Sequence, residues 1–361
     1  MTRVKAAVCH AFGEDLRVED IDLRAPGQGE VEVRLDAVAI CHSDISFIDG
    51  GWGGDLPAVY GHEAAGRIAS VGPGVSAYSV GQKVLVTLIK SCGACSTCAS
   101  GAPVYCSGNA PVEPAIRLAD GTTATKAMEC GAFAEAVVVH QSQLAALPDD
   151  IPSDVASLLA CGVITGVGAV VNTAQVRPGQ NVVVIGAGGV GLNAIQGARI
   201  AGAARIIAMD LSPEKLEGAK AFGATDGVLA GDPKPWKAVS MITGGKMADA
   251  VFVTVGAIPA YDQSLRLLAR GGTMYAVGMP HSGAMAEYEP VIIAAVGQGM
   301  KGSKMGDTVL PRDIPWMVDM YKQGRLKLDE LISNRWRLDQ INEAIADTKT
   351  GHARRNVILL S

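Results

Sequence analysis

Four of the chain's eight cysteines lie close together, at a spacing typical of a metal site. Cys92, Cys95, Cys98 and Cys106 follow the pattern C-x2-C-x2-C-x7-C. Thiolates separated by two residues converge on one ion when the backbone between them turns tightly, and Gly93 permits such a turn. Four sulfurs would complete a tetrahedral shell around zinc with no place for a substrate, which predicts a structural zinc. The spacing leaves open a set of unligated thiols, a redox pair or an iron–sulfur cluster.

A second set of metal-ligand side chains is scattered along the chain. It consists of Cys41, His62 with Glu63 beside it, and Cys161. Taken singly, a cysteine is usually a small buried hydrophobe, and a histidine is usually a satisfied core residue. Two sulfurs and one imidazole on the same ion would form a zinc site with an open fourth position, which is the catalytic arrangement. Sequence spacing alone does not establish that these segments meet.

A glycine-rich segment predicts a dinucleotide site. "GAGGVG" (186–191) fits G-x-G-x-x-G, follows the apolar run "NVVVI" and opens a stretch with helical spacing. Gly186 would allow the tight turn, Gly188 the approach of a pyrophosphate to the helix start, and Gly191 close packing of helix on strand. Asp210 ends the next apolar run. Its carboxylate would accept both ribose hydroxyls and repel a 2′-phosphate, which predicts NAD rather than NADP.

The elements that must position these residues fall into two kinds. Residues 1–145 alternate between short apolar runs and turns rich in glycine, proline and aspartate, which predicts a strand-dominated domain. From about residue 165 strands and helices alternate, which predicts a parallel sheet covered on both faces. The expected strands are 181–186, 205–210, 249–256 and 273–278, and the expected helices are 189–202, 212–224 and 260–272.

Composition excludes several classes of function. The chain has 361 residues, 48% of them apolar and 19% charged, so two well-buried domains are expected. A net charge of −5 and the lack of a basic run argue against nucleic acid. No apolar run has the roughly 18 residues of a membrane span, and the first residues lack a signal-peptide core. We therefore expect a cytoplasmic enzyme without a membrane partner.

Together these motifs resemble the zinc-dependent alcohol dehydrogenases of the medium-chain dehydrogenase/reductase superfamily, in the right order over essentially the whole chain. The resemblance implies a GroES-like catalytic domain formed by residues 1–162 and 305–361, with a Rossmann NAD-binding domain at 163–304 between them. It also implies an active-site cleft at the domain junction. Two zinc ions per chain are expected. Cys41, His62 and Cys161 match the catalytic zinc ligands, and the four clustered cysteines match the structural ligands.

The same resemblance assigns roles around the catalytic zinc. Ser43 matches the hydroxyl that relays the alcohol proton toward the nicotinamide ribose. Asp44 matches the carboxylate that orients the zinc-bound histidine. Glu63 resembles a glutamate that can approach the zinc during ligand exchange. Ser46 stands where many alcohol dehydrogenases continue the relay with a histidine, so the proton must leave by water or another route.

The resemblance also implies a set of cofactor contacts. They are His42 and Arg355 at the pyrophosphate, Gly189 in the glycine turn, Thr165 and Val190 beside the nicotinamide, and the backbones of Val277 and Met305 at its carboxamide. Lys215 could lie over the adenosine ribose, or it could be a solvated helix residue.

The substrate pocket departs from the family pattern. Leu88 stands where a pocket-narrowing aromatic often lies, which indicates room for a bulkier substrate. Trp52, Met128 and Met279 would line the rest. Lys304 could attract an anionic substrate or face solvent. The segment "SGNAPVEP" lacks the arginine that the glutathione-dependent formaldehyde branch uses after the fourth structural cysteine, so that branch ranks lower.

These features predict an NAD-dependent enzyme that oxidises a primary alcohol, bulky or aromatic, to an aldehyde. The zinc would act as a Lewis acid on the alcohol. The alternatives are a secondary-alcohol or polyol dehydrogenase, a glutathione-dependent formaldehyde dehydrogenase, and a catalytically silent zinc-binding homologue. The superfamily suggests a homodimer or homotetramer built through edge strands of the Rossmann sheet. The sequence does not identify the physiological substrate, and it assigns no role to Cys9 and Cys130.

Overall fold

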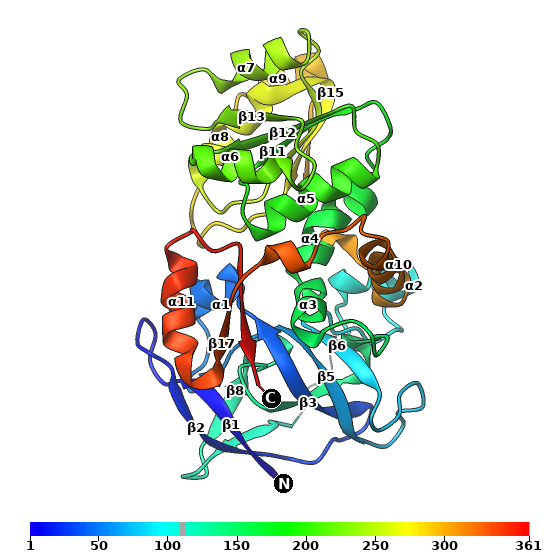
Figure 1. The fold of residues 1–361 in the computed structure, drawn as a ribbon, viewed down its shortest axis with the longest axis vertical. Coiled ribbons are helices and arrows are strands. Elements are labelled where there is room, and N and C mark those ends of the chain that lie inside the picture. The colour runs from blue at the N-terminus through cyan, green and yellow to red at the C-terminus, as the bar shows by residue number, and fades with distance from the viewer. Residues whose placement is uncertain (109–112, 361) are drawn as a thin grey trace. The chain divides into compact units, whose positions relative to one another are not determined.

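The computed structural model describes residues 1–108 and 113–360 (Figure 1). The chain divides into two compact units. The first consists of Met1–Cys161, Val309–Asp319 and Leu328–Ser361, and the second of Gly162–Thr308 and Met320–Lys327. The domain boundaries expected at 162/163 and 304/305 stay predictions.

The first unit is built on two sheets (Figure 1). One is a closed barrel in the order β1 (Thr2–Cys9), β2 (Arg17–Leu23), β7 (Ile116–Leu118), β8 (Thr123–Lys126) and β4 (Ala58–Val59). The other has seven strands, in the order β10 (Leu144–Ala146), β6 (Lys83–Thr87), β5 (Glu63–Val71), β3 (Glu30–Ala39), β18 (Arg355–Leu359) and β17 (Ile332–Arg337), with β9 (Ala136–His140) also on β3.

Strand β3 is the centre of the seven-stranded sheet. Its sequence "EVEVRLDAVA" is buried at most positions, and it pairs with β5 along one edge and with β9 and β18 along the other. The last strand of the chain, β18, pairs antiparallel with β3. Segments from both ends of the chain therefore build this unit, as the resemblance implies.

Short helices and turns connect the strands of the first unit. The helices are α1 (His42–Ile48), α2 (Ser96–Ala99), α3 (Ser153–Ser157) and α11 (Ile341–Lys349), and α10 (Leu310–Lys322) begins in the first unit and ends in the second. The 3-10 turns are η1 (Pro103–Tyr105), η2 (Ala127–Glu129), η3 (Gln141–Gln143), η4 (Leu158–Ala160), η8 (Asp329–Leu331) and η9 (Leu338–Gln340).

The second unit is a parallel sheet of six strands (Figure 1). Their order is β13 (Asp226–Leu229), β12 (Arg205–Asp210), β11 (Asn181–Ile185), β14 (Ala248–Val253), β15 (Leu268–Ala276) and β16 (Gly299–Gly302). In chain order this is 3-2-1-4-5-6, the doubly wound arrangement of a Rossmann domain. The predicted fold class is confirmed for this unit.

The helices of the second unit precede, connect and follow the strands of this sheet. They are α4 (Gly162–Gly168), the π-helical η5 (Ala169–Thr173), α5 (Gly189–Ile200), α6 (Pro213–Lys220), α7 (Pro235–Ile242), α8 (Ile258–Ser264), α9 (Pro290–Val296) and the 3-10 turns η6 (Leu265–Leu267) and η7 (Met305–Asp307). The buried centre of the sheet is made by β-branched residues such as Val183, Val251 and Ile207.

The helix predicted over 260–272 is wrong in its second half. Helix α8 ends at Ser264, one 3-10 turn follows, and strand β15 begins at Leu268. The run "LRLLA" is apolar enough for either a helix or a strand, so periodicity does not decide between them. Gly271 has φ +73°, which a continuing helix does not accommodate, and β15 carries it beside a register shift against β14.

The length and apolar character of a helix determine whether it could span a membrane. Within the described residues, none of the individual helices combines the length and apolar character needed to cross a bilayer. One bent pair, Ser153–Ala160 with Gly162–Thr173, satisfies the criterion of length and composition when its two parts are taken together.

The glycine-rich turn after β11 depends on two close backbone approaches. Gly186 has φ +98°, a left-handed conformation that side chains with a Cβ rarely adopt. Gly191, in the first turn of α5, lies against the same residue. A Cβ added there would be 1.7 Å from the carbonyl oxygen of Gly186. By contrast, a Cβ added at Gly188, just before α5, would have no heavy atom within 4 Å.

We expect the variant Gly191→Ala to lower the free energy of unfolding by about 1–3 kcal/mol, because the new methyl group forces helix α5 away from the turn. Urea denaturation followed by circular dichroism measures the change. Gly188→Ala is the matched control in the same turn and should leave the midpoint nearly unchanged. Equal midpoints for both variants would contradict the packing role of Gly191.

Candidate metal sites and nucleotide-binding turn

The first unit contains a buried group of metal-ligand side chains. Cys41, His62, Glu63 and Cys161 each offer one ligand atom, and these four atoms lie within 4.8 Å of one another. Cys41 precedes α1, His62 and Glu63 stand at the start of β5, and Cys161 lies between η4 and α4. The structure therefore brings together the three segments that the sequence spacing could not join.

Asp44 connects two of these segments. One of its carboxylate oxygens lies 2.9 Å from His62 Nδ1 and accepts the N–H of Gly61 at 3.0 Å. The other accepts the N–H of Cys41 at 3.1 Å, which also caps the start of α1. Asp44 is fully buried. Its position fixes the orientation of the imidazole, because the bond to Nδ1 leaves Nε2 as the ring nitrogen available to a metal.

The residues present fit a zinc ion. The Nε2 atom of His62 is buried and has no hydrogen-bond partner among the described atoms, which is costly unless another ligand satisfies it. Two cysteine sulfurs beside it complete a donor set that suits zinc. Three protein ligands would leave one position open.

The sulfurs and the imidazole influence one another's protonation strongly. The hydrogen bond between the two thiol groups holds the pKa of Cys41 well below its usual range and raises that of Cys161 well above. Burial alone would lower the pKa of His62, but the Asp44 carboxylate and the Cys41 sulfur raise it well above the ordinary value. A cation is therefore favoured between these groups, and a metal ion would displace their protons.

Glu63 and Arg355 form an ion pair beside the ligands. Burial raises the pKa of Glu63 to about 7, against the opposing charge of Arg355. Both side chains are nearly inaccessible to solvent, at 0% and 6%. The sequence analysis expected Arg355 at the cofactor pyrophosphate. The structure shows it paired with Glu63, and a contact with a cofactor stays a prediction.

The remaining predicted residues of the first unit differ in their burial and contacts. The hydroxyl of Ser43 is 3.7 Å from the Cys41 sulfur, and His42 is exposed in the first turn of α1. Leu88 and Met128 are partly buried against the core. Trp52 packs edge-on against Phe47, with ring centroids 5.0 Å apart.

The four clustered cysteines form a second donor set. Their sulfurs lie within 4.8 Å of one another. The turn at Gly93 has φ +73°, and the Cys92 sulfur accepts the backbone N–H of Cys95 at 3.3 Å. Hydrogen bonds, led by the Thr97 hydroxyl, lower the pKa of Cys95 to about 4, whereas burial raises that of Cys98 to about 12. Four converging sulfurs fit a closed zinc shell.

The glycine turn of the second unit is held by side chains from neighbouring strands. Asp210, at the end of β12, accepts the N–H of Ala187 at 2.8 Å and that of Ser212 at 3.0 Å. Thr254 follows β14 and places its hydroxyl 3.0 Å from the carbonyl oxygen of Gly186. Sequence reasoning missed Thr254, since no motif marks it. Gly188 precedes α5, so the helix N-terminus opens on this turn.

The other residues of the second unit that the sequence analysis named lie in several different elements. The hydroxyl of Thr165 is 3.7 Å from the Met305 sulfur. The N–H of Val277 donates to Val253, which leaves its carbonyl oxygen as the group to consider for a carboxamide. Val190 and Gly189 open α5. Met279 and Lys304 are exposed, and Lys215 is half-buried on α6.

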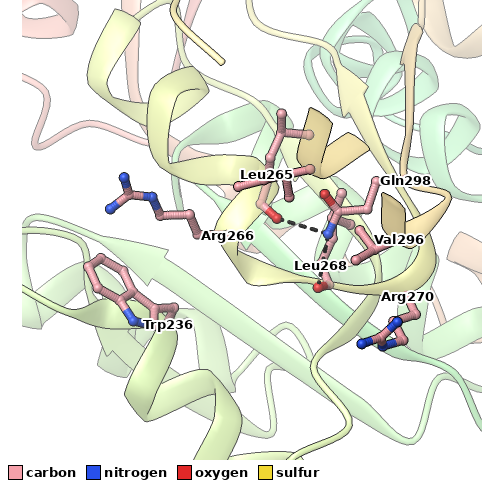
Figure 2. Close-up of a pocket in the computed structure, with 8 residues that line it drawn as sticks. Trp236, Leu265, Arg266, Leu268, Arg270, Val296 and Gln298 are labelled. Carbon is pink, nitrogen blue, oxygen red and sulfur yellow. Dashed lines mark hydrogen bonds between the residues drawn. The ribbon is translucent and has the colours of Figure 1, made fainter. Parts of the chain in front are cut away.

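A pocket lies near the amino ends of β15 and β16. Figure 2 shows Gln298 donating through Nε2 to the carbonyl oxygens of Leu265 and Leu268. The cavity has a volume of about 420 Å³ and is lined in part by Arg266 and Trp236. None of the residues singled out from the sequence lines it.

Comparison with family models identifies both parts of the chain. Residues 27–149 match the model described as "Alcohol dehydrogenase GroES-like domain". Residues 189–323 match the model described as "Zinc-binding dehydrogenase".

Curated relatives match over nearly the full length. The NDMA-dependent alcohol dehydrogenase of Amycolatopsis methanolica is 34% identical, over 99% of each chain. The S-(hydroxymethyl)glutathione dehydrogenase of Escherichia coli is also 34% identical, over 98% of this chain and 99% of that protein.

Solved structures show the same similarity over the full length of the chain. An alcohol dehydrogenase zinc-binding domain protein from Burkholderia ambifaria is 34% identical and superposes with a TM-score of 0.95, covering 100% of this chain and 99% of its own. Benzyl alcohol dehydrogenase from Acinetobacter calcoaceticus is 29% identical, with a TM-score of 0.93 over 100% of both chains. Ligand geometry, fold and full-length similarity agree: the chain belongs to the zinc-dependent alcohol dehydrogenases of the medium-chain dehydrogenase/reductase superfamily.

Proposed function

We propose that the protein oxidises a bulky or aromatic primary alcohol to an aldehyde with NAD. The observation that carries the proposal is the buried group of two thiols and one imidazole, whose Nε2 atom lacks a hydrogen-bond partner among the described atoms. Zinc held there by Cys41, His62 and Cys161 would supply a Lewis acid that lowers the pKa of an alcohol hydroxyl. A second zinc, held by the four clustered cysteines, would brace residues 92–106.

The chain's own residues would handle the proton and the charge. Ser43 stands beside Cys41 and would accept the proton of the alcohol hydroxyl. Asp44 keeps the imidazole of His62 oriented with Nε2 toward the ligand group. Ser46 carries no imidazole for a further relay, so the proton would leave Ser43 through water.

The nicotinamide cofactor would be held by the second unit. The exposed end of α5 offers backbone N–H groups to a pyrophosphate, and the carboxylate of Asp210 would bind the adenosine ribose hydroxyls. The residues proposed to surround the nicotinamide are Thr165, Val190 and the backbones of Val277 and Met305. The Amycolatopsis relative is NDMA-dependent, so NDMA is a second candidate acceptor to assay in place of added NAD.

The size of the substrate is proposed from the residues that the family resemblance assigns to the substrate pocket. Leu88 and Met128 are smaller or more adaptable than an aromatic ring, which favours a bulky alcohol. Similarity to a benzyl alcohol dehydrogenase agrees with an aromatic substrate. Similarity to an S-(hydroxymethyl)glutathione dehydrogenase keeps that substrate as the second candidate, although "SGNAPVEP" lacks the expected arginine. Residues 109–112 of this segment lie outside the described residues.

We further propose that two copies associate through the edge of the parallel sheet. Strand β16 is last in the sheet order and has no partner on its outer edge among the described residues. Helix α9 reads "PVIIAAV", yet none of its residues is buried. An exposed apolar helix and a strand edge with no partner among the described residues are surfaces that a second copy can cover by two-fold pairing.

We expect Cys41→Ser to lower kcat by more than about 100-fold, because it removes one ligand of the catalytic zinc. Cys95→Ala should instead lower the melting temperature with less effect on kcat. Steady-state assays of NADH formation, metal analysis and thermal unfolding measure the three quantities. Near-full turnover by Cys41→Ser with two zinc ions still bound would overturn the assignment.

We expect Asp210→Asn to reduce the preference for NAD over NADP by about tenfold or more, since the repulsion of a 2′-phosphate is lost. The measurement is the ratio of kcat/KM for the two cofactors. Asp226→Asn removes the same charge at the amino end of the neighbouring strand β13 and should leave the ratio unchanged. An unchanged ratio in Asp210→Asn would rule out this role.

We expect Val291→Asp, on α9, to shift the protein toward a 37.2 kDa monomer, because a charge would be buried between copies. Light scattering coupled to size-exclusion chromatography measures the mass. Met241→Asp is the control, since Met241 is similarly exposed, at 77% against 70%, but lies on α7. If the parent chain is itself monomeric, the proposed interface is wrong.

A further inference from the structure

Thr87 makes a side-chain hydrogen bond to the residue that precedes one of the ligand cysteines. It is the last residue of β6 and is fully buried. Its hydroxyl donates to the carbonyl oxygen of Ala160 at 2.6 Å. Ala160 immediately precedes Cys161, so this bond holds the backbone one residue from the sulfur.

The carbonyl of Ala160 stands where a helix ends. The backbone departs from helical geometry at Cys161, with φ −147° and ψ −66°, before α4 begins at Gly162. Carbonyls in the last turn of a helix lack an intrahelical partner and need another donor. The hydroxyl of Thr87 supplies one, in a place where the chain bends to turn the Cys161 side chain toward the ligand group.

Strand β6 connects the same threonine to a second ligand segment. Thr87 is paired with Glu63 in the antiparallel ladder between β5 and β6, and Glu63 follows His62. Thr87 therefore contacts the segment of Cys161 through its side chain, and its backbone is paired with the residue that follows His62. Asp44 performs the corresponding task between Cys41 and His62.

The backbone of Thr87 is itself held. Gln143 is fully buried, and its Nε2 donates to the carbonyl oxygens of Thr87 and Glu129, each at 3.0 Å. A residue with a fixed backbone and a buried hydroxyl directed at a helix end is well suited to hold a ligand in place.

We propose that Thr87 is a positioning residue, which fixes the Cys161 sulfur relative to the imidazole of His62 and thereby tunes the metal site. The proposal rests on the proposed function, since it assumes a metal at this group. The rival interpretation is that the hydrogen bond stabilises the fold alone.

The test uses Co²⁺ as the probe, because its absorption bands report thiolate ligation and coordination geometry. Each full-length variant is stripped of metal and titrated with Co²⁺, and the spectrum of Cys41→Ser, which keeps the four-cysteine site, is subtracted. Thr87→Val preserves shape and removes the hydroxyl. We expect it to weaken Co²⁺ binding at the buried group by about 10- to 100-fold and to shift its visible bands.

Two further variants separate positioning from folding. Thr87→Ser restores a hydroxyl and should recover the parent spectrum and affinity. Thr243→Val removes another buried hydroxyl bonded to a backbone carbonyl, at 2.8 Å, in the second unit. It should lower the melting temperature without changing the Co²⁺ spectrum. If Thr87→Val does not fold, Thr87→Ala leaves room for water at the carbonyl and is compared with Thr87→Ser in the same way.

The outcomes distinguish two failures. If the parent chain and Cys41→Ser bind equal amounts of Co²⁺ with identical spectra, the proposed zinc function fails. If the parent binds the additional ion and Thr87→Val binds it with unchanged affinity and spectrum, zinc chemistry stands and the positioning role of Thr87 is overturned.

Discussion

The main constraint on the first unit is that several ionisable groups are buried together, so their charges must balance one another without help from solvent. Cys41, His62, Glu63, Cys161 and Arg355 lie together with almost no exposure to solvent. A buried charge is tolerated when an opposite charge and hydrogen bonds compensate the loss of hydration. Arg355 compensates Glu63, and Asp44 compensates an imidazole that binds a proton or a metal. A divalent metal ion would compensate the negative charge of the two cysteine sulfurs when they are deprotonated.

This constraint explains why the ligands stand at the ends of elements. Cys41 precedes a helix, His62 precedes a strand, and Cys161 lies between two helical segments. Within a helix or sheet, the backbone N–H and C=O groups bond to one another. At the end of a helix some of these groups have no backbone partner, so side chains can form hydrogen bonds with them. Buried polar side chains such as Asp44 and Gln143 bond to such termini and loops, so the sheet behind them sets the positions of atoms that come from distant parts of the sequence.

Sequence reasoning succeeded where the chemistry is local. The four cysteines and the glycine turn lie within short segments, so spacing alone predicts which atoms can converge. The convergence of Cys41 and Cys161 depends on strand pairing over long separations, and it became an expectation through family resemblance. The extent of the helix after residue 260 was misjudged, because an apolar run between glycines fits a strand equally well. The ion pair of Glu63 with Arg355 gave no local signal, because the partners come from opposite ends of the chain.

That last pairing has a consequence for biosynthesis. Arg355 opens β18, which inserts between β3 and β17. A ribosome releases the N-terminal strands long before this segment emerges. Until then β3 lacks one neighbour in its sheet, and the carboxylate of Glu63 lacks its guanidinium. Before residues 355–359 have been synthesised, the nascent polypeptide therefore lacks both one strand of this sheet and the cation that balances Glu63.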